Sequence, residues 1–207
     1  MKRLALTLAL VVVFCAEGAF AAPKKGTMTD ARDGESYQTV GIGKQIWMAE
    51  NLKVKTEGSW CYEDKETNCQ KYGRLYNWDA AKVACPVGWH LPSKEEFEIL
   101  LKFVGGVQEN AWKWENAGKM LKSTNGWNEY GGKDGNGNDA FGFSALPAGY
   151  RNGNGDFNNE GNRAYFWSST ESVSGSAYYM GLDFSKDDAF LNSFYKTHGF
   201  SVRCVKD

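Results

Sequence analysis

The sequence predicts an α+β domain in which helices come before a final third made of antiparallel strands. Two helical patterns lie between residues 76 and 104, four strand-like runs follow residue 163, and Gly and Asn are concentrated between them. The chain has 207 residues, with 8 Trp, 10 Tyr, 12 Phe, 24 Gly and only 4 Pro. Disordered chains are poor in aromatic residues and long helices are poor in Gly, so this composition excludes both classes.

The first 21 residues have the pattern of a secretory signal peptide. Lys2 and Arg3 precede an apolar run over 4–14, and Ala19-Phe20-Ala21 is a small-x-small cleavage site. We expect cleavage after Ala21 and a secreted, periplasmic or cell-surface location.

The remaining chain has the length of one domain. We expect a short flexible leader over 22–31, because that stretch is polar, and a single folded domain over 32–207. Loss of the leading segment changes the balance from 24 basic and 25 acidic residues to 22 and 24. This balance excludes a basic nucleic-acid-binding surface, and no later stretch has the length and apolarity of a transmembrane segment.

The cysteines predict two disulfides. Cys15 lies in the signal peptide, which leaves Cys61, Cys69, Cys85 and Cys204, and four cysteines in an exported chain allow three pairings. We favour Cys61–Cys69, which closes a short polar segment, and Cys85–Cys204, which ties the middle of the chain to its end. A zinc site is the alternative, but the chain has no C-x-x-C spacing.

The regular elements follow in order. Strands at 37–42 and 45–48 flank Gly43-Lys44 and predict a β-hairpin. A helix over 76–84 ends before Pro86, and Ser93 with Glu96 forms a capping box that opens a helix with its apolar face at 97, 100, 101 and 104. A short helical turn is expected over 117–122. The predicted final strands cover 164–168, 177–184, 189–195 and 200–205.

Loops occupy the centre of the chain. Ten Gly lie between positions 126 and 161 and nine Asn between 125 and 162, interrupted by an apolar run over 141–146. Long loops on a rigid scaffold are common sites of function, so we expect the functional surface here.

Six stretches in order resemble the Fibrobacter succinogenes major paralogous domain family. They are DARDGESYQTVGIGKQIWMAENL at 30–52, YGRLYNWDAA at 72–81, CPVGWHLPSKEEFEIL at 85–100, FGFSALPAGYR at 141–151, FWSSTE at 166–171 and GFSVRCVKD at 199–207. The resemblance implies a C-type-lectin-like fold shared with formylglycine-generating enzymes, with helices packed on twisted antiparallel sheets. In that fold a cysteine ending an early helix pairs with one on the last strand, which supports Cys85–Cys204 separately.

The resemblance does not carry a catalytic site over to this chain. The related oxidation uses copper on two reactive cysteines, whereas all four cysteines here have expected disulfide partners. Hydrolysis by loop carboxylates remains an alternative, with Asp156, Glu160, Asp183 and Glu171 as the available groups. We predict no catalytic residue.

One loop offers oxygens for calcium. Asp134, Asn136, Asn138 and Asp139 resemble the first half of an EF-hand loop, although Asp139 stands where glycine belongs and position 12 is Ala145. Such Asn-Gly loops also form simply because both residues tolerate a left-handed backbone. We therefore predict no cofactor, with a structural calcium ion at this loop as the alternative.

Aromatic residues in and beside the loops suggest a binding surface. Flat rings stack on sugars, and neighbouring Asn, Asp and Arg can bond to hydroxyl groups. The candidate ligand-binding residues are Trp127, Asn128, Tyr150, Arg151, Asp156 and Phe157. By contrast, Trp47, Trp78, Trp89 and Trp167 lie in regular elements and are expected in the core, and only one of Trp112 and Trp114 can face inward on a strand.

These observations favour a non-catalytic binding module for polysaccharide or another cell-surface ligand. The alternatives are a hydrolase or oxidase that uses loop carboxylates, and a structural module for protein–protein interaction.

Overall fold

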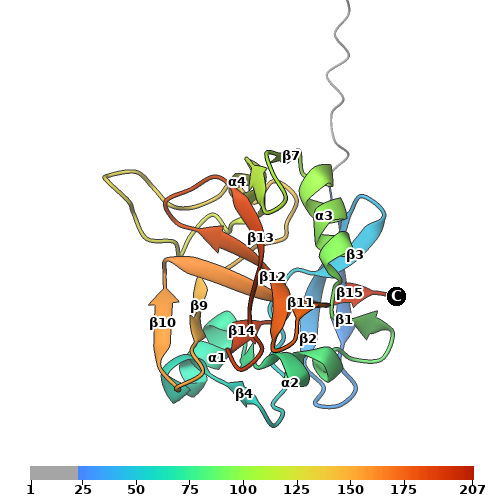
Figure 1. The fold of residues 1–207 in the computed structure, drawn as a ribbon. Coiled ribbons are helices and arrows are strands. Elements are labelled where there is room, and N and C mark those ends of the chain that lie inside the picture. Colours follow the sequence, from blue (N-terminus) through green and yellow to red (C-terminus); the bar gives the residue numbers. More distant parts are fainter. Residues whose placement is uncertain (1–22) are drawn as a thin grey trace, which may run out of the picture.

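The computed structural model describes residues 23–207, so the predicted signal peptide over 1–21 lies outside the described residues. The described chain forms an α+β domain with a five-stranded sheet, an eight-stranded sheet, a two-stranded ribbon and four short α-helices (Figure 1). Strands β11, β12 and β13 cross the middle of the molecule. Helix α3 lies beside β3 on one side of them, and the β9–β10 ribbon lies on the other.

The five-stranded sheet joins the two ends of the described chain. Its order is β1 (Lys24–Thr29), β2 (Ser36–Ile42), β3 (Gln45–Met48), β15 (Val205–Lys206) and β6 (Trp89–His90). The predicted hairpin is confirmed as β2 and β3, with Gly43 in a left-handed conformation at the turn. In β15, Val205 pairs with Trp47 on one side and His90 on the other.

Strand β1 differs from the flexible leader predicted for residues 22–31. All of Lys24–Thr29 pairs antiparallel with β2. The strand covers an edge of β2 that otherwise leaves backbone N–H and C=O groups unpaired. Its side chains are mostly exposed, which explains why the sequence is polar and shows no buried alternation.

The eight-stranded sheet holds the C-terminal strands. Its order is β4 (Ser59–Trp60), β5 (Leu75–Tyr76), β14 (Phe200–Ser201), β11 (Arg163–Val173), β12 (Ser176–Asp183), β13 (Ala189–Tyr195), β8 (Lys113–Glu115) and β7 (Val107–Gln108). The ribbon consists of β9 (Ala148–Arg151) and β10 (Phe157–Glu160). Three predicted strands are confirmed as β11, β12 and β13.

The fourth predicted strand, over 200–205, is divided between the two sheets. After β14 the chain crosses to β15, because the carbonyl groups of Val202 and Cys204 accept hydrogen bonds from Leu52 and Met48. The sequence pattern is continuous across this crossing and does not show the change of sheet.

The helices are α1 (Glu66–Tyr72), α2 (Trp78–Ala84), α3 (Lys94–Phe103) and α4 (Ala117–Leu121), with a 3-10 turn at Tyr62–Asp64. The Asn77 side chain caps α2 by accepting a hydrogen bond from the Ala80 N–H, so the helix begins later than predicted. The capping box of Ser93 and Glu96 is present at α3. Helix α1 was not predicted, because only Cys69 and Tyr72 in it are buried.

Two hydrophobic clusters lie on opposite faces of β12. Met180 and Leu182 belong to the larger cluster, which includes Trp47 and Phe97. Ala177 belongs to the second cluster, where Tyr179 is half-buried, beside α2 and Phe200. This alternation follows from the two-residue period of a strand.

Both predicted disulfides are formed. Cys61–Cys69 joins the start of the 3-10 turn to α1, and Cys85–Cys204 joins the end of α2 to the residue before β15. The second bridge spans 119 residues and holds the two sheets' connecting segments together.

Candidate functional site

A groove on the outer face of the eight-stranded sheet is the best-formed aromatic site in the described chain. It arises at Gly181, which pairs with Tyr165 on β11 and with Phe190 on β13. Because Gly181 has no side chain, the Tyr179 ring lies across it, within 3.0 Å of where a Cβ atom would be. A hollow of about 190 Å³ lies beside these two residues. We call this hollow the aromatic groove; its wall also includes Trp112, Arg163, Tyr179 and Asn192.

The aromatic rings of the groove support one another. Trp112 stacks on Phe190 with ring centroids 5.8 Å apart and planes 20° apart, and its side chain is 47% exposed. Tyr165 and Tyr179 lie 5.6 Å apart and rest on Phe200 below. Packing of this kind restricts ring motion, so the exposed surface is presented to solvent with little conformational freedom left to lose on binding.

Polar groups stand at the edge of these rings. Arg163 donates to the Asp183 carboxylate at 2.7 Å, and Asp183 also accepts from the Ser185 N–H and hydroxyl. Hydrogen bonding to Tyr165 and pairing with Asp183 raise the pKa of Arg163 further above neutral pH. Lys186 lies over the Phe190 ring at 5.4 Å.

The Tyr179 hydroxyl and the Asn192 amide are available to a ligand. Burial raises the pKa of Tyr179 to about 12, so its hydroxyl stays protonated. Among residues 23–207 no hydrogen bond to that hydroxyl occurs, and Asn192 uses only its oxygen, which accepts from the Ser193 N–H. The groove therefore combines flat apolar rings with unoccupied hydrogen-bonding groups.

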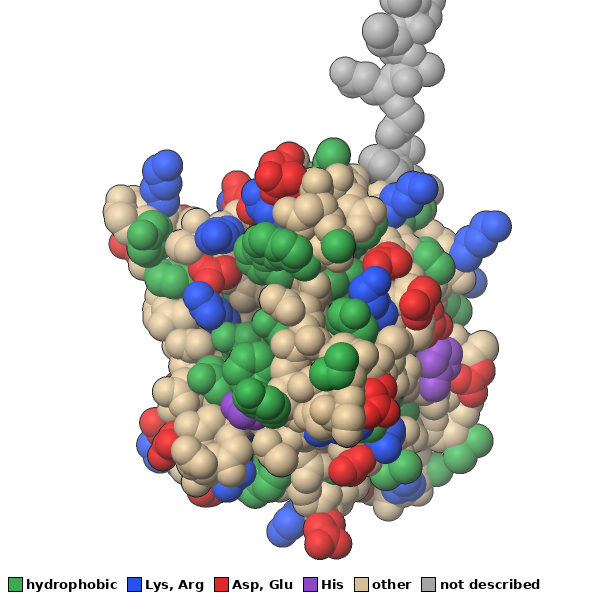
Figure 2. All heavy atoms as spheres, viewed as in Figure 1, with side chains coloured by type: hydrophobic (Ala, Val, Ile, Leu, Met, Phe, Trp, Pro, Cys, Tyr) green, Lys and Arg blue, Asp and Glu red, His purple; other side chains and the backbone are tan. Residues whose placement is uncertain are grey.

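Figure 2 shows hydrophobic side chains gathered on this face, over β12 and β13, with charged side chains around them. Exposing apolar surface to water costs free energy. Contiguous exposed apolar patches on a protein therefore commonly mark binding sites.

Trp127, predicted as a surface platform, is instead part of the core. Its side chain is 5% exposed, and its indole N–H lies within hydrogen-bonding distance of the Ser123 hydroxyl and the Ala145 carbonyl. A ring held in this way cannot stack on a ligand. The stretch rich in Gly had suggested an exposed loop, but here it folds back on α4 and residues 141–146.

Four other predicted ligand-binding residues meet on the β9–β10 ribbon. The Arg151 guanidinium lies 4.1 Å from the Trp60 ring centre and 5.9 Å from that of Phe157. Tyr150 stacks on His198, and Asp156 bonds to Asn152 at the tip of the ribbon. Asn128 is separate from them, because it bonds to Gly161 and Asn162 beyond the other end of β10.

The predicted calcium ligands are used in local turns. Asp134 accepts from the Asn136 N–H, Asn136 accepts from the Trp127 N–H, and Asp139 accepts from the Ser144 N–H and hydroxyl. The Asn138 amide lies 3.6 Å from the Met120 sulfur. The oxygens of this loop thus stabilise its backbone.

The carboxylates considered for hydrolysis have separate partners. Asp183 pairs with Arg163, Glu171 with Lys196, and Glu160 lies 3.9 Å from Lys71. Asp156 is on the ribbon, as described above. Each of these four described carboxylates is therefore held by a different neighbour: Asp183 by Arg163, Glu171 by Lys196, Glu160 by Lys71 and Asp156 by Asn152.

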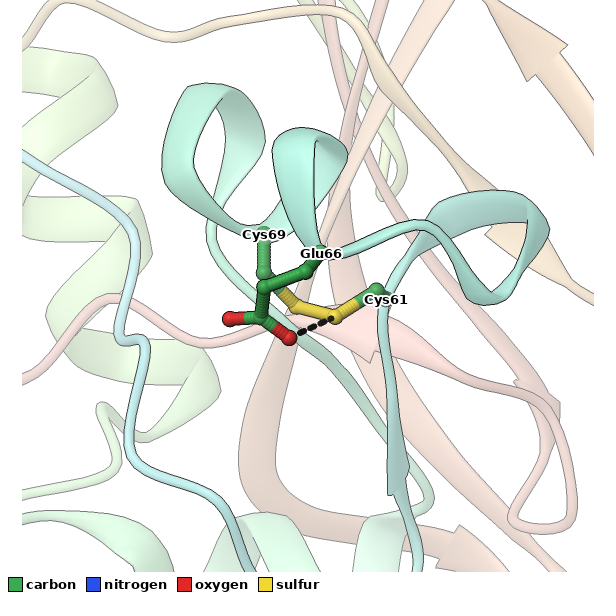
Figure 3. Close-up of side chains that lie close together, drawn as sticks. All are labelled: Cys61, Glu66 and Cys69. Carbon is green, nitrogen blue, oxygen red and sulfur yellow. Dashed lines mark hydrogen bonds between the residues drawn. A yellow bond between two sulfur atoms is a disulfide. The ribbon is translucent and has the colours of Figure 1, made fainter.

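Cys61, Glu66 and Cys69 form a compact group that has the composition of a metal site (Figure 3). The two sulfurs are bonded to each other, so neither is a thiolate ligand. Arg74 also places a guanidinium nitrogen 3.3 Å from the Cys61 sulfur and 3.4 Å from the Cys69 sulfur, where it would repel a cation. This group is a structural bridge held by a buried arginine.

A larger cavity, of about 370 Å³, lies between β2, the end of α1 and residues 139–146. Two of the charged groups in its wall already have partners, since Lys53 pairs with Glu35 and Glu50 and the Glu50 carboxylate accepts from the Gln38 N–H. The aromatic residue in its wall, Tyr72, is buried beneath Lys71. We therefore prefer the smaller aromatic groove as the functional site.

Sequence reasoning missed most of the groove. The structure confirms that one of the Trp112–Trp114 pair faces inward, since Trp114 is buried and Trp112 is exposed. The useful signal was the alternation Phe190, Leu191, Asn192 in β13, which puts a large apolar ring on the solvent face of a strand.

Comparison with known proteins places the chain in a family. The family model described as the Fibrobacter succinogenes major domain matches residues 40–206, which is most of the chain. The chain has no match among curated proteins or among solved structures. This protein belongs to the Fibrobacter succinogenes major domain family.

Proposed function

We propose that this protein is a non-catalytic carbohydrate-binding module that binds polysaccharide in the aromatic groove. The observation that carries the proposal is the exposed Trp112 ring, stacked on the half-buried Phe190 ring, beside unoccupied polar groups of Tyr179 and Asn192. Sugar rings present flat C–H faces that pack on aromatic rings, and their hydroxyl groups bond to amides and phenols at the ring edges.

The geometry favours a flat, equatorially linked glycan such as a β-linked glucan or xylan. The groove lies on a sheet and is shallow, so a ligand must lie along it instead of entering a deep pocket. Equatorial linkage keeps successive sugar faces in one plane, which suits a row of rings fixed on a strand.

An exported location fits this proposal. Two disulfides are formed, as expected in an oxidising compartment. Within residues 23–207 no helix is both long and apolar enough to cross a bilayer. We infer that the protein acts outside the cytoplasm, in the periplasm or at the cell surface.

We also infer a C-type-lectin-like fold. The support is the pairing of N-terminal β2–β3 with C-terminal β15, together with the bridge from the end of α2 to the residue before β15. A solved structure of the domain, compared with known lectin-like domains, tests this inference.

The function is tested by isothermal titration with cello- and xylo-oligosaccharides and by depletion on insoluble cellulose. We expect Trp112→Ala to weaken binding by about tenfold or more, because it removes the exposed ring of the pair. Tyr130→Ala is the matched control, since Tyr130 is also an exposed aromatic residue but lies outside the groove.

Equal binding by the parent and the Trp112 variant would contradict the proposed site. Absence of binding to every glycan, with capture of a protein partner through the same face, would favour the interaction-module alternative. Turnover of the oligosaccharide during the titration would favour the hydrolase alternative.

A further inference from the structure

The solvent face of β13 extends the aromatic groove into a longer row of residues. Phe190, Asn192 and Phe194 alternate with the buried Leu191 and therefore share one face of the strand. Their partners on β12 are Gly181, Tyr179 and Ala177 respectively. Ala177 is buried in the second hydrophobic cluster, so at that end only the β13 side of the row is open to solvent. The groove itself reaches only as far as Asn192.

A second aromatic group lies beyond Asn192. The Phe194 ring meets His198 edge-on at 4.5 Å, and Tyr150 stacks on His198 at 5.9 Å. Phe194 is 39% exposed, and Tyr195 beside it is more exposed. We call Phe194, Tyr195, His198 and Tyr150 the distal aromatic group.

The His198 ring supports this group as a neutral side chain. Burial lowers the pKa of His198, and its Nδ1 atom is buried with no hydrogen-bond partner among the described residues. An uncharged imidazole packs against Phe194 and Tyr150 as another flat ring, so the three rings form one contact cluster.

The separation of the two groups exceeds the reach of one sugar. Alternate residues of a strand are about 7 Å apart, so Phe190 and Phe194 are separated by about 14 Å along β13. A single pyranose ring is comparable in width with one aromatic ring and cannot contact both. Asn192 stands between them with its amide N–H groups unused.

We propose that the ligand is an extended internal segment of a polysaccharide chain, lying along β13 from Trp112 to Phe194. This inference rests on the proposed function and specifies the ligand class. Trp112 and Phe194 both remain exposed at the two ends of the row, so neither end is closed by a covering side chain. A chain can therefore continue past the site in both directions.

The test is a titration of the intact mature protein with cello-oligosaccharides and xylo-oligosaccharides, from disaccharide to hexasaccharide. Affinity is expected to rise by about tenfold or more from the shortest to the longest ligand of the preferred series. Phe194→Leu is expected to weaken binding of the hexasaccharide by about tenfold and to leave disaccharide binding unchanged, because leucine keeps the packing but removes the flat ring. Trp112→Ala is expected to weaken binding at every length.

A second measurement distinguishes internal from terminal binding. On a soluble β-glucan or xylan polymer, we expect more protein molecules bound per chain than the chain has ends. A disaccharide bound as tightly as the hexasaccharide, or saturation at the number of chain ends, would overturn this inference and leave the proposed function intact. Failure to bind any length would instead remove the proposed function.

Discussion

At the scale of single residues, Arg203 is a charge enclosed completely by the core of the described chain. Its guanidinium is fully buried and donates to the Asn51 side chain and to the carbonyl groups of Met48, Phe143 and Ser144. Burial lowers its pKa, and the carboxylates of Asp139 and Glu50 partly offset that effect from outside the hydrogen-bonded shell. Arg203 thus ties three separate segments together from within the core.

Replacing Arg203 is expected to be strongly destabilising. Arg203→Met removes the guanidinium donor from three buried acceptors and one half-buried acceptor, and each loss that leaves a buried acceptor unpaired costs about 1–3 kcal/mol. We expect the free energy of unfolding to fall by at least about 3 kcal/mol in urea denaturation. Lys206→Met, an exposed change on the nearby strand, is the control; a similar small effect of both variants would contradict the role given to Arg203.

The contributions of the two histidines to folding stability are expected to change with pH in opposite directions. Burial disfavours the charged form of His90, but hydrogen bonds to Asp207 and Glu96 outweigh it and raise its pKa. Its stabilising contribution is therefore complete below the unfolded pKa of about 6.5 and is lost as the pH rises through the folded pKa. The lowered pKa of His198 means that stability is lost as the pH falls below about 6.5.

Thermal unfolding from pH 5 to pH 8 separates these contributions. Relative to the parent, we expect His90→Gln to be less stable mainly at acidic pH. We expect His198→Gln to lose less stability than the parent as the pH falls. Identical pH profiles for the parent and both variants would show that neither imidazole is linked to folding.

Residue roles were the hardest feature to predict from the sequence. Trp127 and Trp112 both precede polar residues in stretches without a clear pattern, yet one is buried and the other exposed. The difference depends on contacts with residues 141–146 and with Phe190, which are distant in sequence. A single-sequence pattern contains no information on those contacts.

At the scale of elements, local signals were reliable where they involved backbone capping and strand alternation. The Ser93–Glu96 capping box, the β2–β3 hairpin and strands β11 to β13 were all predicted from short-range patterns. Strand β1 and helix α1 were missed because most of their side chains are exposed, so pairing and a disulfide stabilise them more than an apolar face does.

The cap of α3 gives a prediction for one element. Ser93→Ala removes the acceptor for the Glu96 N–H and should lower the free energy of unfolding by about 1 kcal/mol. Ser174→Ala, in the exposed turn between β11 and β12, is the matched control. Equal stability of the two variants would indicate that the capping box contributes nothing measurable to folding.

At the scale of the whole molecule, the two disulfides close loops of very different length. Cys61–Cys69 has a sequence separation of 8 residues and Cys85–Cys204 one of 119. Both pairings were predicted, the second from the family resemblance as well as from cysteine count. The α+β class was likewise predicted, whereas the exchange of residues 200–205 between two sheets was not.

Loop length predicts unequal stabilisation by the two bridges. In the chain-entropy model the long bridge contributes about 5 kcal/mol and the short bridge about 2.5 kcal/mol. One variant replaces both cysteines of the long bridge by alanine, and the other replaces both cysteines of the short bridge. In urea without reductant, we expect the long-bridge variant to lose about 2.5 kcal/mol more free energy of unfolding than the short-bridge variant. A larger loss of stability on replacing Cys61 and Cys69 would contradict this expectation. It would mean that the loss of the sulfur contacts of the buried Arg74 costs more than the difference in loop-closure entropy.

The place of β15 imposes an order on assembly. This strand lies between β3 and β6, so Trp47 and His90 cannot acquire their shared neighbour until Val205 has emerged from the ribosome. During synthesis, the edge of β3 that pairs with β15 therefore stays unpaired until nearly the whole domain has been made. The first sheet is therefore completed only when the last strand of the domain has been made.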